Sequence, residues 1–314
     1  MVRKVLFFLF FLSCLAVFLL YRQDKLPFAS PLPKVYGASD TLKQINNWFP
    51  KTASDTKDVN FDISAKAAIV VNYDTGEVIF SKNTQERLPA ASTIKIMTAL
   101  LALDNSKLTD KFSVSQKAAT VGEDSMGLSE GEQLTLDDLL YGLLLPSGND
   151  AAVTLAEGVW GSEDAFTRAM NDKARQLGLK DTKFINSSGL DEDSEHQYTT
   201  AYDLVTLARY MWDRHKDFRR IASTYHIYLE ATSSHKAFDL YNGTNLLTTY
   251  PGVQGIKPGY TPEAGLCLVT IAENKNVKLI AVILGSNNRR TEMMELLDYG
   301  FSKLGIKVDH PALL

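Results

Sequence analysis

The stretch Ala90–Ala99, which reads Ala-Ala-Ser-Thr-Ile-Lys-Ile-Met-Thr-Ala, decides how the rest of this 314-residue chain is interpreted. It follows Pro89 and opens a helical pattern of apolar residues that runs from Ser92 to Leu103. On a helix, positions i and i+3 share a face, so the amine of Lys95 is presented beside the hydroxyl of Ser92. The free N–H groups at a helix N-terminus would stabilise a developing oxyanion. The stretch therefore predicts a nucleophilic serine with a lysine as its base.

The same Ser-x-x-Lys spacing occurs at Ser54–Lys57 and Ser233–Lys236, so the spacing alone is a weak signal. Both of those pairs stand in polar surroundings, where a solvated charge is the simpler interpretation. Ser92 differs because an apolar run, Ile96–Leu103, follows it. Burial of that run would desolvate the Lys95 amine, which favours the neutral form that a base requires.

Alternating and helical patterns on either side of this stretch predict the fold class. Two short strands, Ala67–Tyr73 and Glu77–Lys82, are joined by Asp74-Thr75-Gly76, a sequence typical of a hairpin turn. Helices are expected at Leu136–Leu145, Asp150–Gly158, Ser162–Gly178 and Thr200–Arg214, strands at Gly252–Tyr260, Gly265–Ala272 and Lys278–Leu284, and a last helix at Arg290–Leu304. Strands at both ends predict one α+β domain over residues 61–306. Its antiparallel sheet is expected to be packed with helices, with a central all-helical insert.

Two further polar groups stand out along the chain. Ser147-Gly148-Asn149 lies in a turn between two expected helices, and Lys257-Pro258-Gly259 lies on a late strand. Asn149 directly precedes a helix, so the first group also fits a helix N-cap. Lysine and proline blunt edge strands against unwanted pairing, so the second group also fits an edge strand. The order of all three groups along the chain favours a chemical role over these structural ones.

Composition and motif searches exclude several other classes of function. The net charge is −4 and no basic patch is present, so nucleic acid is not an expected partner. The five histidines never form His-x-x-x-His and no Cys-x-x-Cys occurs, so no metal site is expected. We expect no cofactor, since no phosphate-binding Gly-x-x-x-x-Gly-Lys loop is present either. Of the two cysteines, Cys14 lies in an apolar N-terminal run and Cys267 in the body, so no intramolecular disulfide is expected.

Residues 1–25 are interpreted as a targeting segment. Arg3 and Lys4 precede an uncharged, apolar run of 17 residues, Val5–Tyr21, which is at the short limit for a membrane-spanning helix. No small-x-small cleavage pattern lies close after it, so an uncleaved anchor in the cytoplasmic membrane is expected, with the body outside. The alternative is a cleaved signal peptide, because the run is only slightly longer than a secretory core. Residues 26–60, with four prolines, are expected to be a linker, and residues 307–314 a short tail.

The three polar groups, in this order, resemble the Ser-x-x-Lys, Ser-x-Asn and Lys-x-Gly motifs of penicillin-recognising serine enzymes. Within that group the chain is similar to the D-alanyl-D-alanine carboxypeptidases of the low-molecular-mass penicillin-binding type. The longer stretches that carry the resemblance are Ala90–Ala99, Leu144–Ala152, Phe184–Leu190, His196 with Thr199–Leu204, and Gly255–Leu268. The resemblance covers about Ile63 to Leu304 and implies a β-lactamase/transpeptidase-like fold.

The resemblance implies a role for each group. Ser92 would attack the carbonyl between two D-alanines of a peptidoglycan stem peptide and form an acyl-enzyme, with Lys95 as base and Ser147 passing the proton to the leaving amine. The N–H groups of Ser92 and Tyr260 would form the oxyanion hole. The residues expected to bind substrate are Asn149, through the amide, Lys257, through its charge near the carboxylate, and Gly259, Tyr260 and Thr261. β-Lactam antibiotics are expected to be covalent inhibitors.

Pro258 departs from the family pattern, because threonine usually stands at this position. By the family resemblance, the departure removes a hydroxyl that would hydrogen-bond the substrate carboxylate, and it leaves Thr261 as a substitute.

Three alternative functions stay open. A β-lactamase shares the three motifs but would need a carboxylate placed to activate the deacylating water. An endopeptidase that cuts peptidoglycan cross-links is closer to this sequence than a β-lactamase. A non-catalytic wall-binding protein would keep the fold without turnover.

The expected anchor gives a first prediction. If Val5–Tyr21 is uncleaved, the mature protein keeps its N-terminus and fractionates with membranes. Intact-mass measurement and N-terminal sequencing of the protein purified from its membranes check this. A mature N-terminus downstream of Tyr21 would refute the anchor and support the signal peptide.

Overall fold

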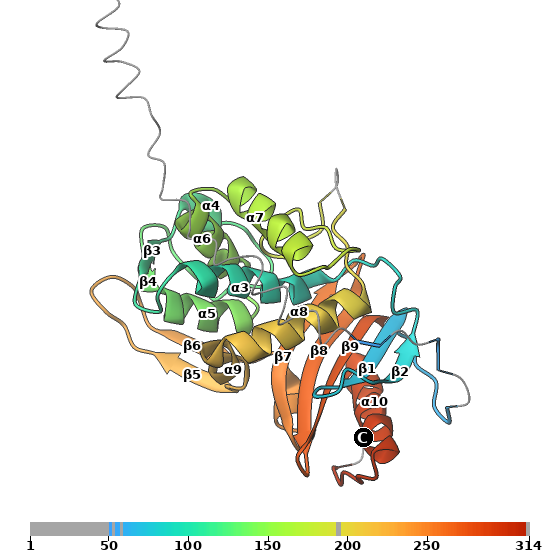
Figure 1. Cartoon of the computed structure of the whole chain (residues 1–314). Helices are drawn as coiled ribbons and strands as arrows, with labels where there is room; N and C mark the ends of the chain where they lie inside the picture. The colour runs from blue at the N-terminus through green and yellow to red at the C-terminus, as the bar shows by residue number, and fades with distance from the viewer. Residues whose placement is uncertain (1–49, 52–53, 57–58, 193–195, 312–314) are drawn as a thin grey trace, which may run out of the picture. The chain divides into compact units, whose positions relative to one another are not determined.

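A five-stranded antiparallel sheet carries the domain, in the strand order β2-β1-β9-β8-β7 (Figure 1). This computed structural model describes residues 50–51, 54–56, 59–192 and 196–311. The strands are β1 Ala67–Asn72, β2 Val78–Lys82, β7 Val253–Thr261, β8 Gly265–Asn274 and β9 Val277–Ser286. Strands distant in sequence therefore pair, since β1 lies between β2 and β9, and β7 is left at an edge.

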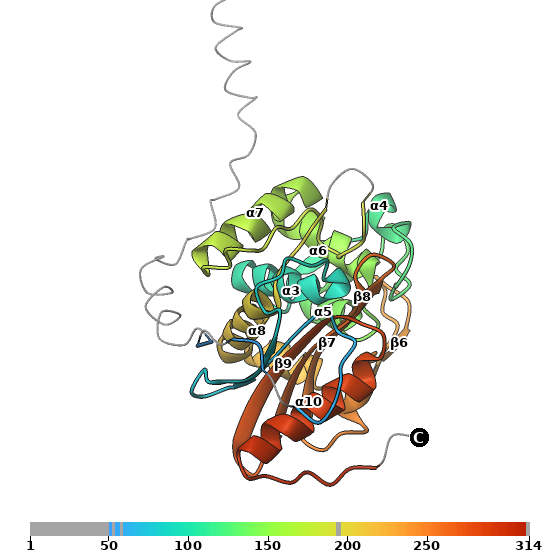
Figure 2. The same ribbon diagram turned by 90° about the vertical axis from the view of Figure 1, so that its right-hand side faces the viewer.

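Both faces of the sheet are buried, because alternate side chains of each strand enter two different cores. Ile69 and Val71 of β1 pack in the core shared with the helices, whereas Ala68 and Val70 pack in a second core. The two helices that cover the sheet are α8, Ala201–Arg214, and α10, Arg289–Lys303. Figure 2 shows α10 on one side of the sheet and α8 on the other, so the domain has three layers.

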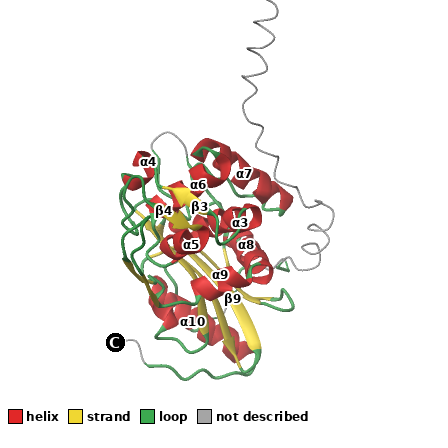
Figure 3. Ribbon diagram, turned by 90° about the vertical axis from the view of Figure 1, so that its left-hand side faces the viewer, coloured by secondary structure: helices red, strands yellow, loops and turns green. Residues whose placement is uncertain are grey.

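Helix α3 runs through the centre of the helical block, which explains why its sequence is apolar on all sides. Lys95–Ala102 are all buried, and α3 contacts α5, α6, α7 and α8. The helices of the block are α3 Lys95–Asn105, α4 Gln116–Ala119, α5 Leu136–Leu144, α6 Asn149–Trp160, α7 Glu163–Gln176 and α9 Lys216–Ala222. Figure 3 shows the block, in red, gathered on one side of the yellow sheet. The 3-10 helix η1, Ala91–Ile94, leads into α3 and contacts β7, so Ser92 lies where the block meets the sheet.

The predicted α+β class and antiparallel sheet are confirmed. The insert is not all helical, however, because two short antiparallel ribbons interrupt it. They are β3 Lys111–Ser113 with β4 Gln133–Thr135, and β5 His226–Leu229 with β6 Phe238–Tyr241. Strands of three or four residues carry too few alternations to stand out in a sequence.

The chain is already bonded to the domain before β1. Lys51 N–H donates to Gly76 O at 2.9 Å, and Thr56 N–H donates to Ser81 O at 2.8 Å. These bonds join the incoming chain to the β1–β2 hairpin. The expected linker of residues 26–60 therefore stops short of residue 60, because its C-terminal part is held against the sheet.

The C-terminal tail returns to α10. His310 Nε2 lies 2.9 Å from Asp298 Oδ2, and the His310 ring lies 4.9 Å from the Tyr250 ring between centroids. Among the described residues, no helix is both long and apolar enough to cross a bilayer. The expected anchor, Val5–Tyr21, lies outside them.

Candidate active site

Ser92 follows a strained residue and lies between two glycines. Ala91 has φ = +47°, a left-handed conformation that costs a non-glycine residue about 1–2 kcal/mol. A Cβ on Gly189 would lie 2.3 Å from the Ala91 carbonyl oxygen. A Cβ on Gly259 of β7 would lie 3.0 Å from the Ser92 nitrogen. Glycine at both positions allows this close approach of backbones, which fixes the serine between the helical block and the sheet.

The Lys95 amine is the centre of the hydrogen bonds around Ser92. Its Nζ lies 2.7 Å from Ser92 Oγ and 2.7 Å from Asn149 Oδ1. The Ser188 carbonyl oxygen, on the segment between α7 and α8, lies 2.6 Å from the same nitrogen. The side chain is fully buried. Burial lowers the pKa of Lys95 well below its ordinary value, and the charge of Lys257 lowers it further.

The three contacts fit either protonation state of Lys95, and its lowered pKa favours the neutral one. A neutral amine has two N–H donors and one lone pair. Asn149 Oδ1 and the Ser188 carbonyl oxygen can only accept, so they take the two N–H groups. The lone pair then faces Ser92 Oγ, because the hydroxyl is the one partner of the three able to donate. In its neutral form Lys95 can accept the proton of Ser92, which is the action of a general base.

Ser147 occupies the left-handed region, with φ = +68°, in the turn between α5 and α6. Gly148 precedes the first residue of α6 and no side chain caps this helix, which excludes the cap interpretation of the group. Ser147 Oγ is buried yet has no hydrogen-bond partner among the described residues. A buried hydroxyl without a partner costs about 1–3 kcal/mol, and a bound substrate would supply the partner.

Asn149 connects the lysine to the loop of residues 122–128. Its Nδ2 donates to Gly122 O at 3.1 Å, and its backbone N–H donates to Asp124 O at 2.7 Å. The buried carboxylate of Asp150 accepts backbone N–H groups of the same loop. Sequence analysis missed this role of Asp150, because an acid in the first turn of a helix is expected for the helix dipole alone.

Lys257 is a second buried lysine, on the edge strand β7. It is fully buried, and its Nζ donates to the Pro258 carbonyl oxygen at 3.1 Å. Burial lowers the pKa of Lys257 to about 7, Asp124 opposes this change, and Arg289 adds to it. The ammonium is therefore present in only part of the molecules at neutral pH, and an anionic ligand would favour it.

Arg289 is a functional candidate that sequence analysis missed. It is the first residue of α10, and its Nη1 donates to the Gly259 carbonyl oxygen at 2.7 Å. It is close enough to Lys257 to lower the pKa of that lysine, so two cations stand beside Gly259. An arginine at a helix N-terminus opposes the helix dipole, and this is the signal that could have identified it.

The other expected residues of β7 differ in their surroundings. Pro258 is buried and lies opposite Leu268 in continuous pairing with β8, as expected for a proline on an edge strand. Tyr260 is 59% exposed. Thr261 Oγ1 donates to Asp191 Oδ1 at 3.0 Å, so its hydroxyl is engaged within the fold. This bond argues against Thr261 as a replacement for the hydroxyl that is missing at Pro258.

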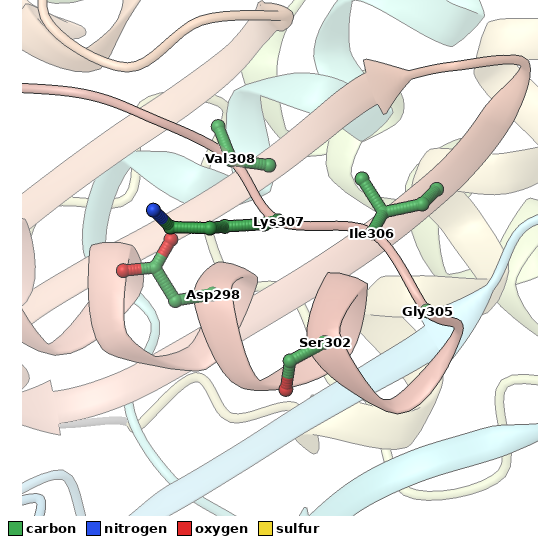
Figure 4. Close-up of a pocket in the computed structure, with 6 residues that line it drawn as sticks. All are labelled: Asp298, Ser302, Gly305, Ile306, Lys307 and Val308. Atoms are coloured by element: carbon green, nitrogen blue, oxygen red, sulfur yellow. The ribbon is translucent and has the colours of Figure 1, made fainter.

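A hollow in the surface lies elsewhere, at the C-terminal end of α10. Its volume is about 450 Å³, and the residues that line it are Asp298, Ser302, Gly305, Ile306, Lys307 and Val308 (Figure 4). None of them belongs to the group around Ser92. In the described part of the chain, no three His, Cys, Asp or Glu side chains are grouped so that they could hold a metal ion.

The sequence matches a family model described as D-alanyl-D-alanine carboxypeptidase, peptidase family S11, over residues 51–288. It is 41% identical over 247 residues to the D-alanyl-D-alanine carboxypeptidase DacF of Bacillus subtilis, which covers 76% of this chain and 62% of DacF. It is 33% identical over 254 residues to DacD of Escherichia coli, with 76% of this chain and 63% of DacD covered. The chain thus spans about three-fifths of the length of these relatives.

Solved structures share the fold. The Streptomyces K15 DD-transpeptidase superposes with a TM-score of 0.72 at 28% identity, over 80% of this chain and 100% of that one. The ampicillin-bound form of penicillin-binding protein D2 from Listeria monocytogenes superposes with a TM-score of 0.66 at 28% identity, over 77% and 99%. The β-lactamase/transpeptidase-like fold that the resemblance implies is therefore confirmed. The family match and the buried Ser92–Lys95 pair agree, and the chain belongs to the D-alanyl-D-alanine carboxypeptidase family, peptidase family S11.

Proposed function

We propose that this protein is a serine D-Ala-D-Ala carboxypeptidase that removes the terminal D-alanine of peptidoglycan stem peptides through an acyl-enzyme. The observation that carries the proposal is the environment of the buried Lys95 amine, whose two acceptor partners leave its lone pair for the Ser92 hydroxyl. Such a base activates a serine without a histidine. Family membership supports the choice of substrate.

In the first step, Ser92 Oγ gives its proton to Lys95 Nζ and bonds to the carbonyl carbon between the two D-alanines. The backbone N–H groups of Ser92 and Tyr260 would hold the oxyanion that forms. When the tetrahedral species collapses, the C–N bond breaks and the leaving amine takes a proton by way of Ser147. The Ser147 hydroxyl suits this transfer, because it has no partner among the described residues. Water then hydrolyses the acyl-enzyme and restores Ser92.

Recognition of the terminal carboxylate is assigned to the two cations beside Gly259. Lys257 is fully buried and Arg289 is partly buried, so both act where a charge–charge attraction is stronger than in bulk water. Asn149 Nδ2 keeps a second hydrogen after its bond to Gly122 O, and this N–H is left for a substrate carbonyl.

Two alternatives are less well supported by the contacts. A β-lactamase needs a carboxylate that activates water, but the buried Asp150, one of the acids that act on Lys95, is occupied by backbone N–H groups of residues 126–128. A non-catalytic wall-binding protein would gain nothing from a buried lysine, because removing an amine from water destabilises the fold. An endopeptidase would attack the same kind of bond in a cross-link, so substrate assays must separate it from a carboxypeptidase.

The catalytic domain is proposed to act outside the bacterial cytoplasmic membrane, attached by Val5–Tyr21. The apolar, uncharged sequence of that segment supports this arrangement. The chemistry of the substrate supports it as well, since peptidoglycan lies outside that membrane.

Covalent capture by benzylpenicillin tests the mechanism. The full chain should form a stable adduct of one penicillin per protein, because the β-lactam carbonyl takes the place of the D-Ala-D-Ala carbonyl. Ser92→Ala should abolish the adduct. Ser54→Ala and Ser233→Ala, the serines of the other Ser-x-x-Lys pairs, should keep it as matched controls. Intact-protein mass spectrometry gives the readout. An adduct that persists in Ser92→Ala would refute acylation at Ser92.

The substrate needs a separate assay. The chain is incubated with a stem pentapeptide and with a cross-linked dimer, and the products are identified by mass spectrometry. Release of one D-alanine from the pentapeptide alone supports the carboxypeptidase, whereas cleavage of the dimer supports the endopeptidase. A penicillin adduct without turnover of either substrate would support the non-catalytic binding protein.

Pro258→Thr should raise carboxypeptidase efficiency. The proline sits in an intact edge strand, so the substitution restores a hydroxyl without disturbing the sheet. A hydrogen bond to a charged group contributes about 1.5–3 kcal/mol, roughly ten- to a hundredfold in kcat/KM. Rates with the pentapeptide and with benzylpenicillin should both rise, with little change in melting temperature. Unchanged rates would show that the carboxylate is held without this position.

The pH dependence of penicillin acylation should have two limbs with different origins. As pH falls, Lys95 becomes protonated, its lone pair is lost and the rate falls. As pH rises through about 7, Lys257 loses its charge and attraction for the carboxylate weakens. Lys257→Arg should remove the alkaline fall, because a guanidinium stays charged. The second-order rate constant measured against pH checks this, and a variant of unchanged melting temperature that keeps the alkaline fall would contradict the assignment.

A further inference from the structure

Exposed aromatic side chains gather around one hairpin. Among the described residues, the large apolar side chains with the highest exposure are Tyr225 at 48%, Tyr228 at 53%, Tyr241 at 52% and Tyr260 at 59%. The first three lie on the β5–β6 hairpin or directly before it, and the fourth lies on β7. Large aromatic groups exposed together usually mark a binding surface.

The outer face of the hairpin is built by strict alternation. Its inner residues, Ile227, Leu229, Phe238 and Leu240, pack against the helical core. Its outer residues are His226, Tyr228, Asp239 and Tyr241, which we call the outer face of the hairpin. In the pairing register His226 lies opposite Tyr241, and Tyr228 lies opposite Asp239.

Two rings of the outer face, His226 and Tyr241, contact each other, and Tyr225 directly before the hairpin adds a third ring. The His226 and Tyr241 rings stack with centroids 4.3 Å apart, and the Tyr225 ring meets the Tyr241 ring edge-on at 6.1 Å. His226 Nε2 lies 2.5 Å from Asp239 Oδ1. The result is an exposed cluster of aromatic rings beside a carboxylate, held in place by contacts within the protein.

The hairpin is fixed to the domain at its tip. Gln133 N–H donates to Ser234 O at 2.9 Å, and Lys236 Nζ donates to Ser129 Oγ at 2.8 Å. At the other end, Gly243 N–H donates to Leu145 O at 3.0 Å. Binding to a surface that is already fixed costs little conformational entropy.

The base of the hairpin adjoins the active site. Leu145, the partner of Gly243, stands two residues before Ser147. A Cβ on Gly243 would lie 3.6 Å from Pro258 Cγ, on the strand that carries Lys257. The chain that leaves Tyr241 therefore passes close to both Leu145 and β7. Figure 1 shows the β5–β6 hairpin extending from the region of α9 and β7.

We propose that the outer face of the hairpin binds the glycan strand that carries the stem peptide, a chain of N-acetylated amino sugars. This inference rests on the proposed function. A sugar ring has a flat C–H face that stacks on an aromatic ring. Its hydroxyl and amide groups can form hydrogen bonds with the tyrosine hydroxyls and can donate to the Asp239 carboxylate. The His226–Asp239 pair leaves the face without excess positive charge, which suits a weakly charged glycan and not a polyanion.

The attachment of the substrate fits this position. The D-alanine end of the stem peptide must reach Ser92, while its other end stays joined to a sugar. A five-residue peptide spans at most about 17 Å when extended. The sugar must therefore lie within that distance of Ser92, and the base of the β5–β6 hairpin is close to the active site through Gly243.

Two double variants of the full chain in detergent test the proposal. Tyr228→Ser with Tyr241→Ser removes both rings, and Tyr228→Phe with Tyr241→Phe keeps them as the matched control. D-Alanine release is measured from a free stem pentapeptide and from the same peptide on polymeric glycan. The serine variant should lose roughly tenfold or more in kcat/KM on the glycan-borne substrate, equal to about 1.4 kcal/mol. It should keep its rate on the free pentapeptide, and the phenylalanine variant should keep most of both rates.

Sedimentation with glycan strands stripped of peptide gives an independent readout. The chain carrying Ser92→Ala should sediment with the strands, and the added tyrosine-to-serine changes should abolish this. Turnover of neither substrate by the unaltered chain would refute the proposed function, while sedimentation would still decide glycan binding. Unchanged rates on the glycan-borne substrate, or an equal fall on both substrates, would overturn the proposal, because the tyrosines would then serve the fold.

Discussion

The burial of one amine among three fixed partners is the constraint on which the rest of the domain depends. Lys95 Nζ draws its partners from three separate parts of the chain: Ser92 from η1, Asn149 from the start of α6, and Ser188 from the segment before α8. Removal of an ammonium from water costs several kcal/mol, and this cost lowers the pKa of Lys95 and favours its neutral form. Because every partner lies within 2.7 Å, a shift of any one element leaves a buried polar group unsatisfied.

Strain in the backbone accompanies this arrangement on both sides of the site. Ala91 and Ser147 both have left-handed backbone conformations although neither is glycine. Ala91 directly precedes Ser92, and Ser147 is itself one of the predicted catalytic residues. Such conformations persist only where the surroundings determine them. At Ala91 the surroundings are backbone: Gly189 on one side and Gly259 on the other. Ser92 is therefore in close backbone contact with the sheet edge on one side and with the helical block on the other.

Features that extend over many residues were predictable from the sequence, and single contacts were not. The apolar runs of β8 and β9, each of ten residues, and the apolar sequence of α3 leave clear patterns, so the antiparallel sheet and the central helix could be predicted. Ser92, Lys95 and Asn149 could be named because their side chains carry the motif. The carbonyl of Ser188 could not, since any residue offers a carbonyl and only the fold selects this one. Arg289 was missed because its contact with Gly259 joins parts of the chain 30 residues apart.

The two glycines that flank Ser92 also limit which substitutions the backbone around it can accommodate. Each position has room for a hydrogen atom and no side chain, so variation beside Ser92 would displace the backbone that sets the reaction geometry. Side chains have more room further from Ser92, as at Tyr260, which is exposed. The backbone next to Ser92 therefore tolerates fewer substitutions than the exposed residues around the site.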